Sequence, residues 1–296
     1  MLPDQGWSHC TPNLRALSYR FAVCCDDRAL GRHIEKSLSA LCDTGEGEAG
    51  GSDEPHRYTL TPVASGILDL ARDGELVRAG LRCTDVLGWL VWDVNRAAAE
   101  ASEQHLLFHA GGLEAAGRGI LVPGPSGSGK STLTAALARA GLAYLSDELV
   151  AFELASRMLL PYPKPITLKA GSCATLPELA PPADDPFDSG SSTSREWQVP
   201  VGGGTPHRVG VPCEAALVVV PRYDPGGATT LFPLTETEAF FTLALNAVNL
   251  IPHRSAGTDA LGELAAQCEC FRLSFSDLHE ACRLVVDLVG LPAART

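Results

Sequence analysis

The chain has 296 residues, of which 45% are apolar and 20% charged, and its formal net charge at pH 7 is -12. This length allows one large domain or two smaller ones, and the composition is typical of a globular protein. The acidic balance argues against a nucleic-acid partner, because neutralising phosphates requires a basic face and no basic run is present. The apolar runs are too short and too polar to cross a bilayer, and the first residues do not resemble a secretory signal. We therefore expect a cytoplasmic protein with no membrane partner.

Cysteine and lysine are the two residue types whose numbers and positions in this chain are informative. Ten cysteines are spread through the chain without a C-x-x-C pair, so we expect most of them to be reduced, partly buried thiols. The sequence CEC at 268–270 could chelate a metal, but the alternation through CECFRLSF is typical of a β-strand. Only four of the 23 basic residues are lysines, namely Lys36, Lys130, Lys164 and Lys169. Each lysine is therefore a candidate for a specific role.

The first hundred residues predict a small α/β unit. Strand, helix, strands and helix are expected in turn over residues 17–25, 26–41, 56–80 and 83–102. Asp26 or Asp27 is the expected N-cap of the first helix, and Thr84 or Asp85 begins the second. The strands are expected to turn at Asp73-Gly74. The acidic, glycine-rich segment 43–55 has nothing to bury and predicts a disordered loop or a tolerated insertion.

A second unit is expected to begin near residue 101. Residues 105–124 predict a strand, a turn region and another strand. The stretch 181–206, rich in Pro, Ser, Asp and Gly, predicts a solvated loop, although lids over phosphate sites commonly have this composition. More strand is expected within 214–234, and helices near 235–250, 258–267 and 276–289. The expected organisation is an α/β chain with a small domain over residues 1–100 and a second domain over residues 101–296.

The segment GPSGSGKS at 124–131 matches G-x-x-x-x-G-K-[ST], the Walker A or P-loop pattern. Its glycines let successive backbone N–H groups point at phosphate oxygens, Lys130 adds a compact cation, and the Ser131 hydroxyl can ligate magnesium. A buried strand before it and a helix over 130–141 after it place a helix N-terminus at the phosphates. The predicted nucleotide-binding residues here are Gly124, Ser126, Gly127, Ser128, Gly129, Lys130, Ser131 and Thr132.

Adjacent acids follow in LAYLSDEL at 142–149. We expect this segment to be the strand reached by the crossover from the glycine loop, so that Asp147 and Glu148 lie at the same edge of the sheet as the loop. A carboxylate there could hold magnesium or accept the proton of an attacking hydroxyl. Because phosphoryl transfer depends on positioning and charge neutralisation, Lys130, magnesium and one carboxylate are a sufficient set. The structural alternative is that Asp147 only caps a turn.

Three segments together resemble the HPr kinase family of bacterial serine kinases. They are LLFHA with His109, GPSGSGKS itself, and the acid pair in YLSDELV. The resemblance covers residues 105–290 and is clearest over 105–150. It implies a P-loop kinase domain akin to phosphoenolpyruvate carboxykinase, with ATP and Mg²⁺ as cofactors. It also implies that Asp147 is the general base, that His109 lies near the transferred phosphate, and that Ser131, Asp147 and Glu148 hold the metal.

The departures from that family narrow what the resemblance implies. A Glu-Ile-Arg-Gly-Leu-Gly type stretch, which supports phosphorolysis and oligomer contacts in HPr kinases, is absent between residues 150 and 215. The reverse reaction and a hexamer are therefore not implied, and the sequence does not indicate an oligomeric state. The acid pair is Asp-Glu instead of Asp-Asp, and Ala110 follows His109 where the family usually has glycine. The chain resembles the divergent HPr-kinase-related proteins more than the regulator of sugar uptake.

Three basic residues are weaker candidates. Lys169 could reach a phosphate or the acceptor, or be a solvated lysine at a strand end. Arg222 closes the apolar run ALVVVPR and could reach over the triphosphate, or be an exposed arginine at a sheet edge. Arg254 has less to recommend it.

These patterns predict an ATP-dependent kinase that transfers the γ-phosphoryl group to a hydroxyl, with a serine of a peptide or small protein as acceptor. A kinase for a small-molecule hydroxyl is one alternative. Another is a nucleotide-binding regulator or scaffold without phosphotransfer, which would have no need of a base aimed at an acceptor. The amino-terminal unit carries no site residues of its own, and we hypothesise that it recruits the acceptor.

Overall fold

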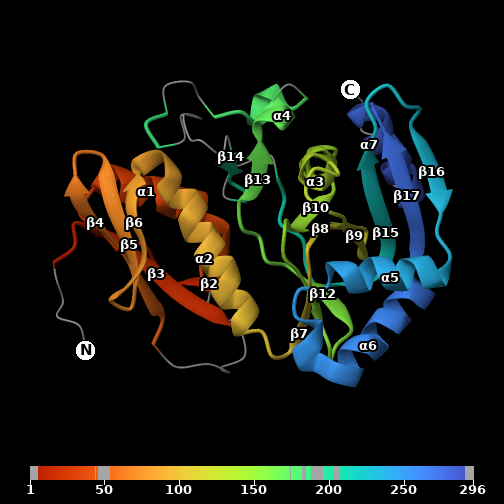
Figure 1. Cartoon of the computed structure of the whole chain (residues 1–296), viewed down its shortest axis with the longest axis horizontal. Coiled ribbons are helices and arrows are strands. Elements are labelled where there is room, and N and C mark those ends of the chain that lie inside the picture. Colours follow the sequence, from red (N-terminus) through yellow and green to blue (C-terminus); the bar gives the residue numbers. More distant parts are fainter. Residues whose placement is uncertain are drawn as a thin grey trace. The chain divides into compact units, whose positions relative to one another are not determined.

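The computed structural model describes residues 6–43, 45, 54–173, 175–181, 185–187, 196–202 and 207–290. Within these residues, seven α-helices and several sheets form a mixed α/β fold (Figure 1). The chain divides into two compact units, the first comprising Met1–Ser102 and Thr167–Gly203, the second Glu103–Ile166 and Gly204–Thr296. The first boundary lies near the expected one after residue 100, whereas Thr167–Gly203 belongs to the first unit instead of continuing the second.

The first unit is built on a six-stranded sheet. Its strands are β1 (His9–Cys10), β2 (Leu14–Ala16), β3 (Tyr19–Cys25), β4 (His56–Ala64), β5 (Ile67–Arg72) and β6 (Glu75–Arg82). The expected turn at Asp73-Gly74 joins β5 to β6, and both residues have the positive φ of a type I′ hairpin, at 52° and 85°. Most of the predicted loop at 43–55 lies outside the described residues.

The two helices of the first unit begin close to where their caps predict. Helix α1 (Arg28–Ser37) starts after Asp27, whose carboxylate accepts from the backbone N–H of Ala29 at 2.8 Å. Helix α2 (Val86–Glu100) starts after the 3₁₀ turn η2 (Cys83–Asp85). Both helices occupy the predicted segments.

Two features of the first unit correct the sequence-based expectations. Cys10 and Cys24 form a disulfide and are the exception to the expected thiols, since seven other cysteines of the described residues are free. The antiparallel register of β1 and β3 sets Cys10 and Cys24 directly opposite, with 4.1 Å between their Cα atoms. Within the expected loop 181–206, Glu196–Val199 forms strand β14, which pairs with β13 (Ile166–Lys169). The short elements α4 (Ala170–Cys173) and η3 (Pro177–Leu179) precede it, and most of the remaining loop lies outside the described residues.

The second unit is built on a nine-stranded mixed sheet with the order β10-β8-β9-β15-β12-β11-β7, in which β17 also pairs with β15 and β16. The strands are β7 (His105–Phe108), β8 (Ala110–Ala115), β9 (Arg118–Pro123), β10 (Ala143–Ser146), β11 (Val150–Glu153), β12 (Met158–Leu160), β15 (Cys213–Tyr223), β16 (Thr230–Pro233) and β17 (Glu269–Phe275). As the alternation in CECFRLSF predicts, β17 forms there. No cluster of three or more His, Cys, Asp or Glu side chains in the described part of the chain is arranged to hold a metal.

Strand β8 occupies the segment in which a turn was expected. Its glycines have a packing reason. A Cβ on Gly111 would clash with the Thr134 hydroxyl on helix α3 (Lys130–Arg139), and one on Gly112 would lie 2.9 Å from Val150 on the opposite face. Gly111 therefore lets α3 approach one face of the sheet closely, while Gly112 makes room for Val150 on the other.

The strand order places the glycine loop and the acids at one edge of the sheet. Strands β9 and β10 each pair antiparallel with β8, which lies between them, so they run in the same direction. Within this sheet, Gly112 of β8 is the partner of both Leu121 on β9 and Ser146 on β10. The crossover through α3 therefore skips one strand, yet the loop after β9 and Asp147 after β10 leave the sheet at the same end.

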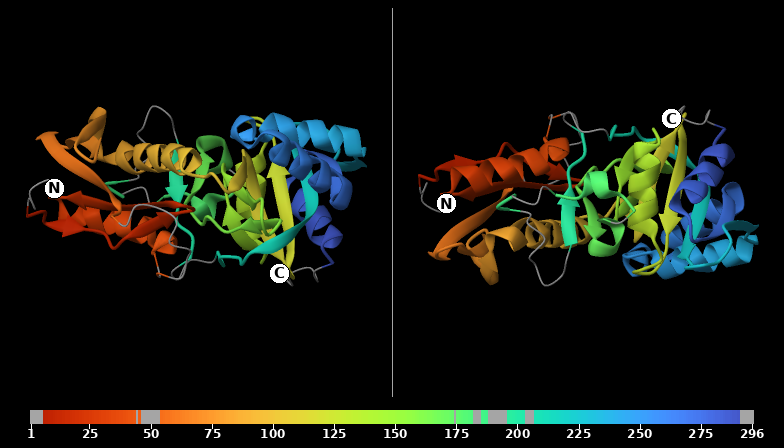
Figure 2. Two further views of the ribbon diagram at one scale, coloured as in Figure 1. Left: turned by 90° about the horizontal axis from the view of Figure 1, so that it is seen from below. Right: turned by 90° about the horizontal axis from the view of Figure 1, so that it is seen from above.

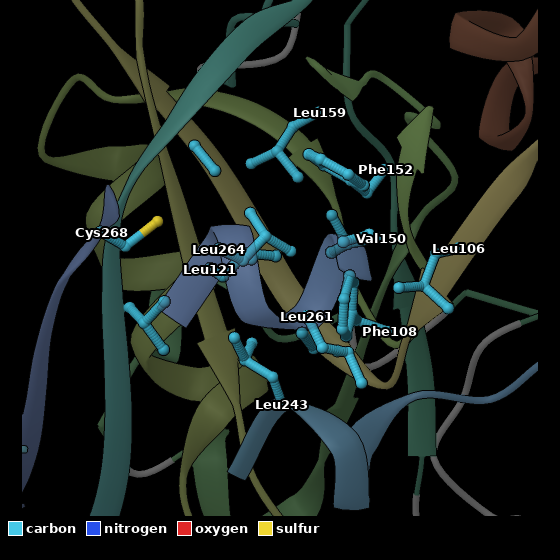
Figure 3. Close-up of a cluster of buried hydrophobic side chains, with 14 of the residues drawn as sticks. Leu106, Phe108, Leu121, Val150, Phe152, Leu159, Leu243, Leu261, Leu264 and Cys268 are labelled. Atoms are coloured by element: carbon cyan, nitrogen blue, oxygen red, sulfur yellow. The ribbon is translucent and has the colours of Figure 1, made fainter. Parts of the chain in front are cut away.

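The core of the second unit lies between the sheet and two helices. Helices α5 (Glu236–Asn246) and α6 (Leu250–Gln267) pack against each other (Figures 1 and 2). Figure 3 shows Leu243, Leu261 and Leu264 from these helices meeting sheet residues such as Phe108 and Val150. Helix α3 covers the other face and contacts α7 (Leu278–Leu288).

The last helices differ slightly from their expected bounds. Helix α6 spans Leu250–Gln267 but consists of two helical segments joined at a kink, and the expected helix near 258–267 lies in the second of them. Pro252 lies in the first turn, where its missing N–H is tolerated. The backbone kink is at Arg254, with φ 49° and ψ -126°. None of the described helices combines the length and apolar character that crossing a bilayer requires.

We predict that Leu243→Ala lowers the free energy of unfolding by about 2–5 kcal/mol, because it leaves a cavity in a fully buried cluster. The matched control on the same helix is Leu245→Ala, since the Leu245 side chain is 86% exposed and its loss should change stability by less than about 0.5 kcal/mol. Urea denaturation of both variants measures the difference. Equal effects would contradict the described orientation of α5.

Candidate functional site

The glycine loop connects β9 to α3 and is contacted by two neighbouring strands of the sheet. Gly127 and Gly129 have φ of 85° and 92°, in the left-handed region that favours glycine. A side chain on Gly129 would also meet the ring of Phe275, whose Cζ lies 2.9 Å from a Cβ built there. The backbone N–H of Tyr223 donates to the Ser128 carbonyl at 3.1 Å. Strands β15 and β17 therefore fix the loop conformation.

The loop has the groups that an anion requires. Gly129 is the N-cap of α3, so the first-turn amides of this ten-residue helix and its dipole face the loop. The buried hydroxyl oxygen of Ser128 has no hydrogen-bond partner among the described residues. Lys130, at the first position of α3, is only 7% exposed. An orphaned hydroxyl, helix amides and a lysine fit a phosphate chain.

The two sequence motifs meet through a direct hydrogen bond. The Ser131 hydroxyl donates to Asp147 Oδ1 at 3.1 Å, although the residues are far apart in sequence. Asp147 is completely buried. In P-loop proteins, the loop hydroxyl and a carboxylate are the groups that hold magnesium beside the phosphates. One hydroxyl with one or two carboxylates is a donor set that suits this ion, because magnesium is completed by phosphate and water oxygens.

Burial and charge set the protonation of Asp147. Burial disfavours its charged form and raises its pKa to about 6, even though the Lys164 ammonium, the Lys130 ammonium and the Ser131 hydrogen bond all act in the opposite direction. The neighbouring Glu148 carboxylate adds to the increase. Asp147 is thus more basic than an ordinary aspartate.

Glu148 follows Asp147 in an unusual backbone conformation and is paired with Lys164. Its φ is 66°, a region that non-glycine residues seldom adopt. Its Oε2 lies 3.4 Å from the Lys164 ammonium, and Lys164 is completely buried. Burial, the largest single influence, opposes ionisation of Glu148, but the charge and hydrogen bond of Lys164, together with His109 and Lys130, outweigh it and lower the pKa of Glu148. The sequence motifs did not place Lys164 in the site, although lysine is rare in this chain and its rarity marked Lys164 as a candidate for a specific role.

His109 lies between β7 and β8, next to the acids. Its Nδ1 is 3.2 Å from the Glu148 carbonyl oxygen, and its backbone N–H donates to the Asn246 carbonyl at 2.7 Å. A carbonyl oxygen only accepts, so Nδ1 carries the proton and Nε2 is left as an acceptor in the neutral ring. Burial and the positive charge of Lys130 lower the pKa of His109. The imidazole is therefore neutral at pH 7.

The other predicted residues fall into two groups. Gly124, Ser126, Gly127 and Thr132 lie in the loop or the first turn of α3, and Arg222 is an exposed residue of β15 next to Tyr223, which contacts the loop backbone. Lys169 is in the first unit, where its ammonium lies 3.5 Å from Glu196 Oε1. Arg254 is exposed at the kink of α6. The second unit thus gathers the loop, the acids, His109 and Lys164.

We predict that metal-free Asp147→Asn becomes more stable relative to the wild type as pH rises. The folded protein keeps the Asp147 proton up to about pH 6, whereas the unfolded chain releases it near its ordinary pKa, so this group lowers wild-type stability as pH rises between those values. Between pH 4.5 and 7.5 the difference should grow by about 2 kcal/mol. Urea titrations in EDTA measure it, and a difference that stays constant with pH would contradict the burial of this carboxylate.

Comparisons with known proteins add no family assignment. No protein-family model and no curated protein sequence matches the chain. The resemblance to HPr kinases therefore rests on the motifs around His109, the glycine loop and the acid pair alone. Any function for the site has to be argued from the geometry of these residues.

Proposed function

We propose that the chain is an ATP-dependent kinase that transfers the γ-phosphoryl group to the hydroxyl of a serine in a peptide or small protein. One observation carries the proposal: the Ser131 hydroxyl at the phosphate loop contacts a fully buried carboxylate, Asp147, whose pKa is about 6. A protein that only binds nucleotide can use a carboxylate there to hold magnesium, but it has no need of one that accepts a proton. A hydroxyl acceptor does need one, because its proton must leave when it attacks phosphorus.

The loop residues bind the triphosphate. The amides of the loop and the first turn of α3 donate to phosphate oxygens, as the Ser128 hydroxyl is free to do, and the Lys130 ammonium neutralises negative charge. Arg222, exposed at the end of β15, is available to the outer phosphates. Magnesium, when bound with ATP, neutralises charge on the transferring group. Ser131 and the acid pair are the residues that would hold it.

Asp147 accepts the proton in the transfer step. The acceptor oxygen attacks the γ-phosphorus, the bond from that phosphorus to the leaving oxygen of ADP breaks, and the hydroxyl proton moves to the Asp147 carboxylate. Burial raises the pKa of Asp147 above that of an ordinary aspartate, which makes this carboxylate a better proton acceptor than an exposed one. Because His109 is neutral and its Nε2 is an acceptor, His109 can orient the acceptor hydroxyl without adding charge.

Incubation with γ-labelled ATP, Mg²⁺ and peptide libraries tests the proposal. Matched peptides in which alanine replaces serine are the control. Label transfer to serine peptides alone supports the proposal. Label on a small-molecule hydroxyl would change the acceptor class. Nucleotide binding without any transfer would contradict the kinase and leave a nucleotide-dependent regulator.

We predict that Asp147→Asn lowers kcat by about 10²–10⁴, because removing a positioned base typically has this effect. Its Kd for ATP should stay within about threefold of the wild type, since the loop amides and Lys130 remain. Stopped-flow binding of a fluorescent ATP analogue and label transfer measure the two quantities. The matched control is Asp287→Asn, on the exposed side of α7. A variant with wild-type turnover would exclude Asp147 as the base.

A further inference from the structure

Lys164 is a buried cation that the proposed reaction has not yet used. It is 0% exposed, and its ammonium lies 3.4 Å from Glu148 Oε2 and donates to the Pro165 carbonyl at 3.1 Å. Its backbone is held as firmly, because the Tyr144 hydroxyl on β10 donates to the Lys164 carbonyl at 3.0 Å. Prolines precede and follow it in the sequence PKP and restrict the backbone. The fold therefore delivers this ammonium to a fixed position.

Stability does not explain such an arrangement. Lysines are almost never fully buried, and an ion pair of this kind is often less stabilising than apolar side chains of the same volume. The partner, Glu148, is moreover held at φ 66°. Backbone strain of this kind persists where the surrounding structure enforces it, and it concentrates at functional sites. The pair is therefore better explained by what it does at the acid pair.

The charges around Asp147 and Glu148 indicate what Lys164 does there. Asp147 and Glu148 bring two neighbouring carboxylates, and the Lys164 charge acts on both of them. In many phosphoryl-transfer sites, the negative charge of such carboxylates is neutralised by two divalent cations about 3.5–4 Å apart. Here an ammonium already occupies one side of Glu148, at a distance suited to an ion pair.

We propose that Lys164 is a resident substitute for a second metal ion, so that the acid pair holds a single Mg²⁺ when nucleotide binds. Lys164 is thus a positioning residue, which acts through Glu148 and not on substrate. This inference rests on the proposed nucleotide site and adds the number of ions that it takes. With Lys164 replaced by a neutral side chain, Glu148 loses its counter-ion and becomes a carboxylate that recruits a second ion.

Counting bound Mn²⁺ by electron paramagnetic resonance tests the inference without relying on activity. The full-length chain is titrated with Mn²⁺ in the presence of a non-hydrolysable ATP analogue. We expect about one Mn²⁺ per chain for the wild type and about two for Lys164→Met. The double variant Glu148→Gln/Lys164→Met, which removes both charges, should return to about one. Lys36→Met, at an exposed position on α1, is the control for losing a lysine.

The outcomes separate the two proposals. A wild type that binds no Mn²⁺ with the analogue would contradict the nucleotide site and this inference with it. One Mn²⁺ in both the wild type and Lys164→Met would overturn only the inference. Two Mn²⁺ in the wild type would overturn it as well. If Lys164→Met fails to fold, the double variant decides, since two Mn²⁺ without the Glu148 carboxylate would contradict the role given to Lys164. A merely structural lysine would lower the bound Mn²⁺ when replaced and would not raise it.

Discussion

The hydrogen bond between the Ser131 hydroxyl and Asp147 is the contact on which the candidate site depends. It exists because β9 and β10 run in the same direction on either side of β8 and end at the same edge of the sheet. The loop that follows one strand and the acids that follow the other are thereby forced together. Gly111 in β8 lets α3 lie close to the sheet, and the N-terminus of this helix follows the loop directly. Strand order and small side chains thus bring these groups together in the protein without a ligand.

Electrostatics at this edge are balanced by burial. Two carboxylates sit beside two lysines, and one member of each kind, Asp147 and Lys164, is completely buried. Desolvation raises the pKa of Asp147 while the ammonium groups favour its ionised form, a balance that suits the general base we propose. Burying these charges costs stability.

The sequence predicted the parts of this site that depend on local patterns. Local residue spacing predicted the glycine loop, the helix after it and the strand before the acids. The order strand, loop, helix, strand then predicted that the loop and the acids lie at the same edge of the sheet. Contacts that depend on non-local packing could not be predicted. No local pattern predicts that β8 is a strand. Its glycines are needed because Thr134 and Val150, from other segments of the chain, pack directly against them. The disulfide between Cys10 and Cys24 likewise follows from strand register, and the pairing of Lys164 with Glu148 depends on how two connections outside the strands fold against each other.

A crystal structure of the chain with Mg²⁺ and a non-hydrolysable ATP analogue is the most direct measurement of the central claim. The account predicts that the terminal phosphates lie in the loop of residues 124–131 and contact Lys130. The metal lies at Ser131, and the Asp147 carboxylate faces the γ-phosphate. Nucleotide bound elsewhere, or a γ-phosphate turned away from Asp147, would contradict it.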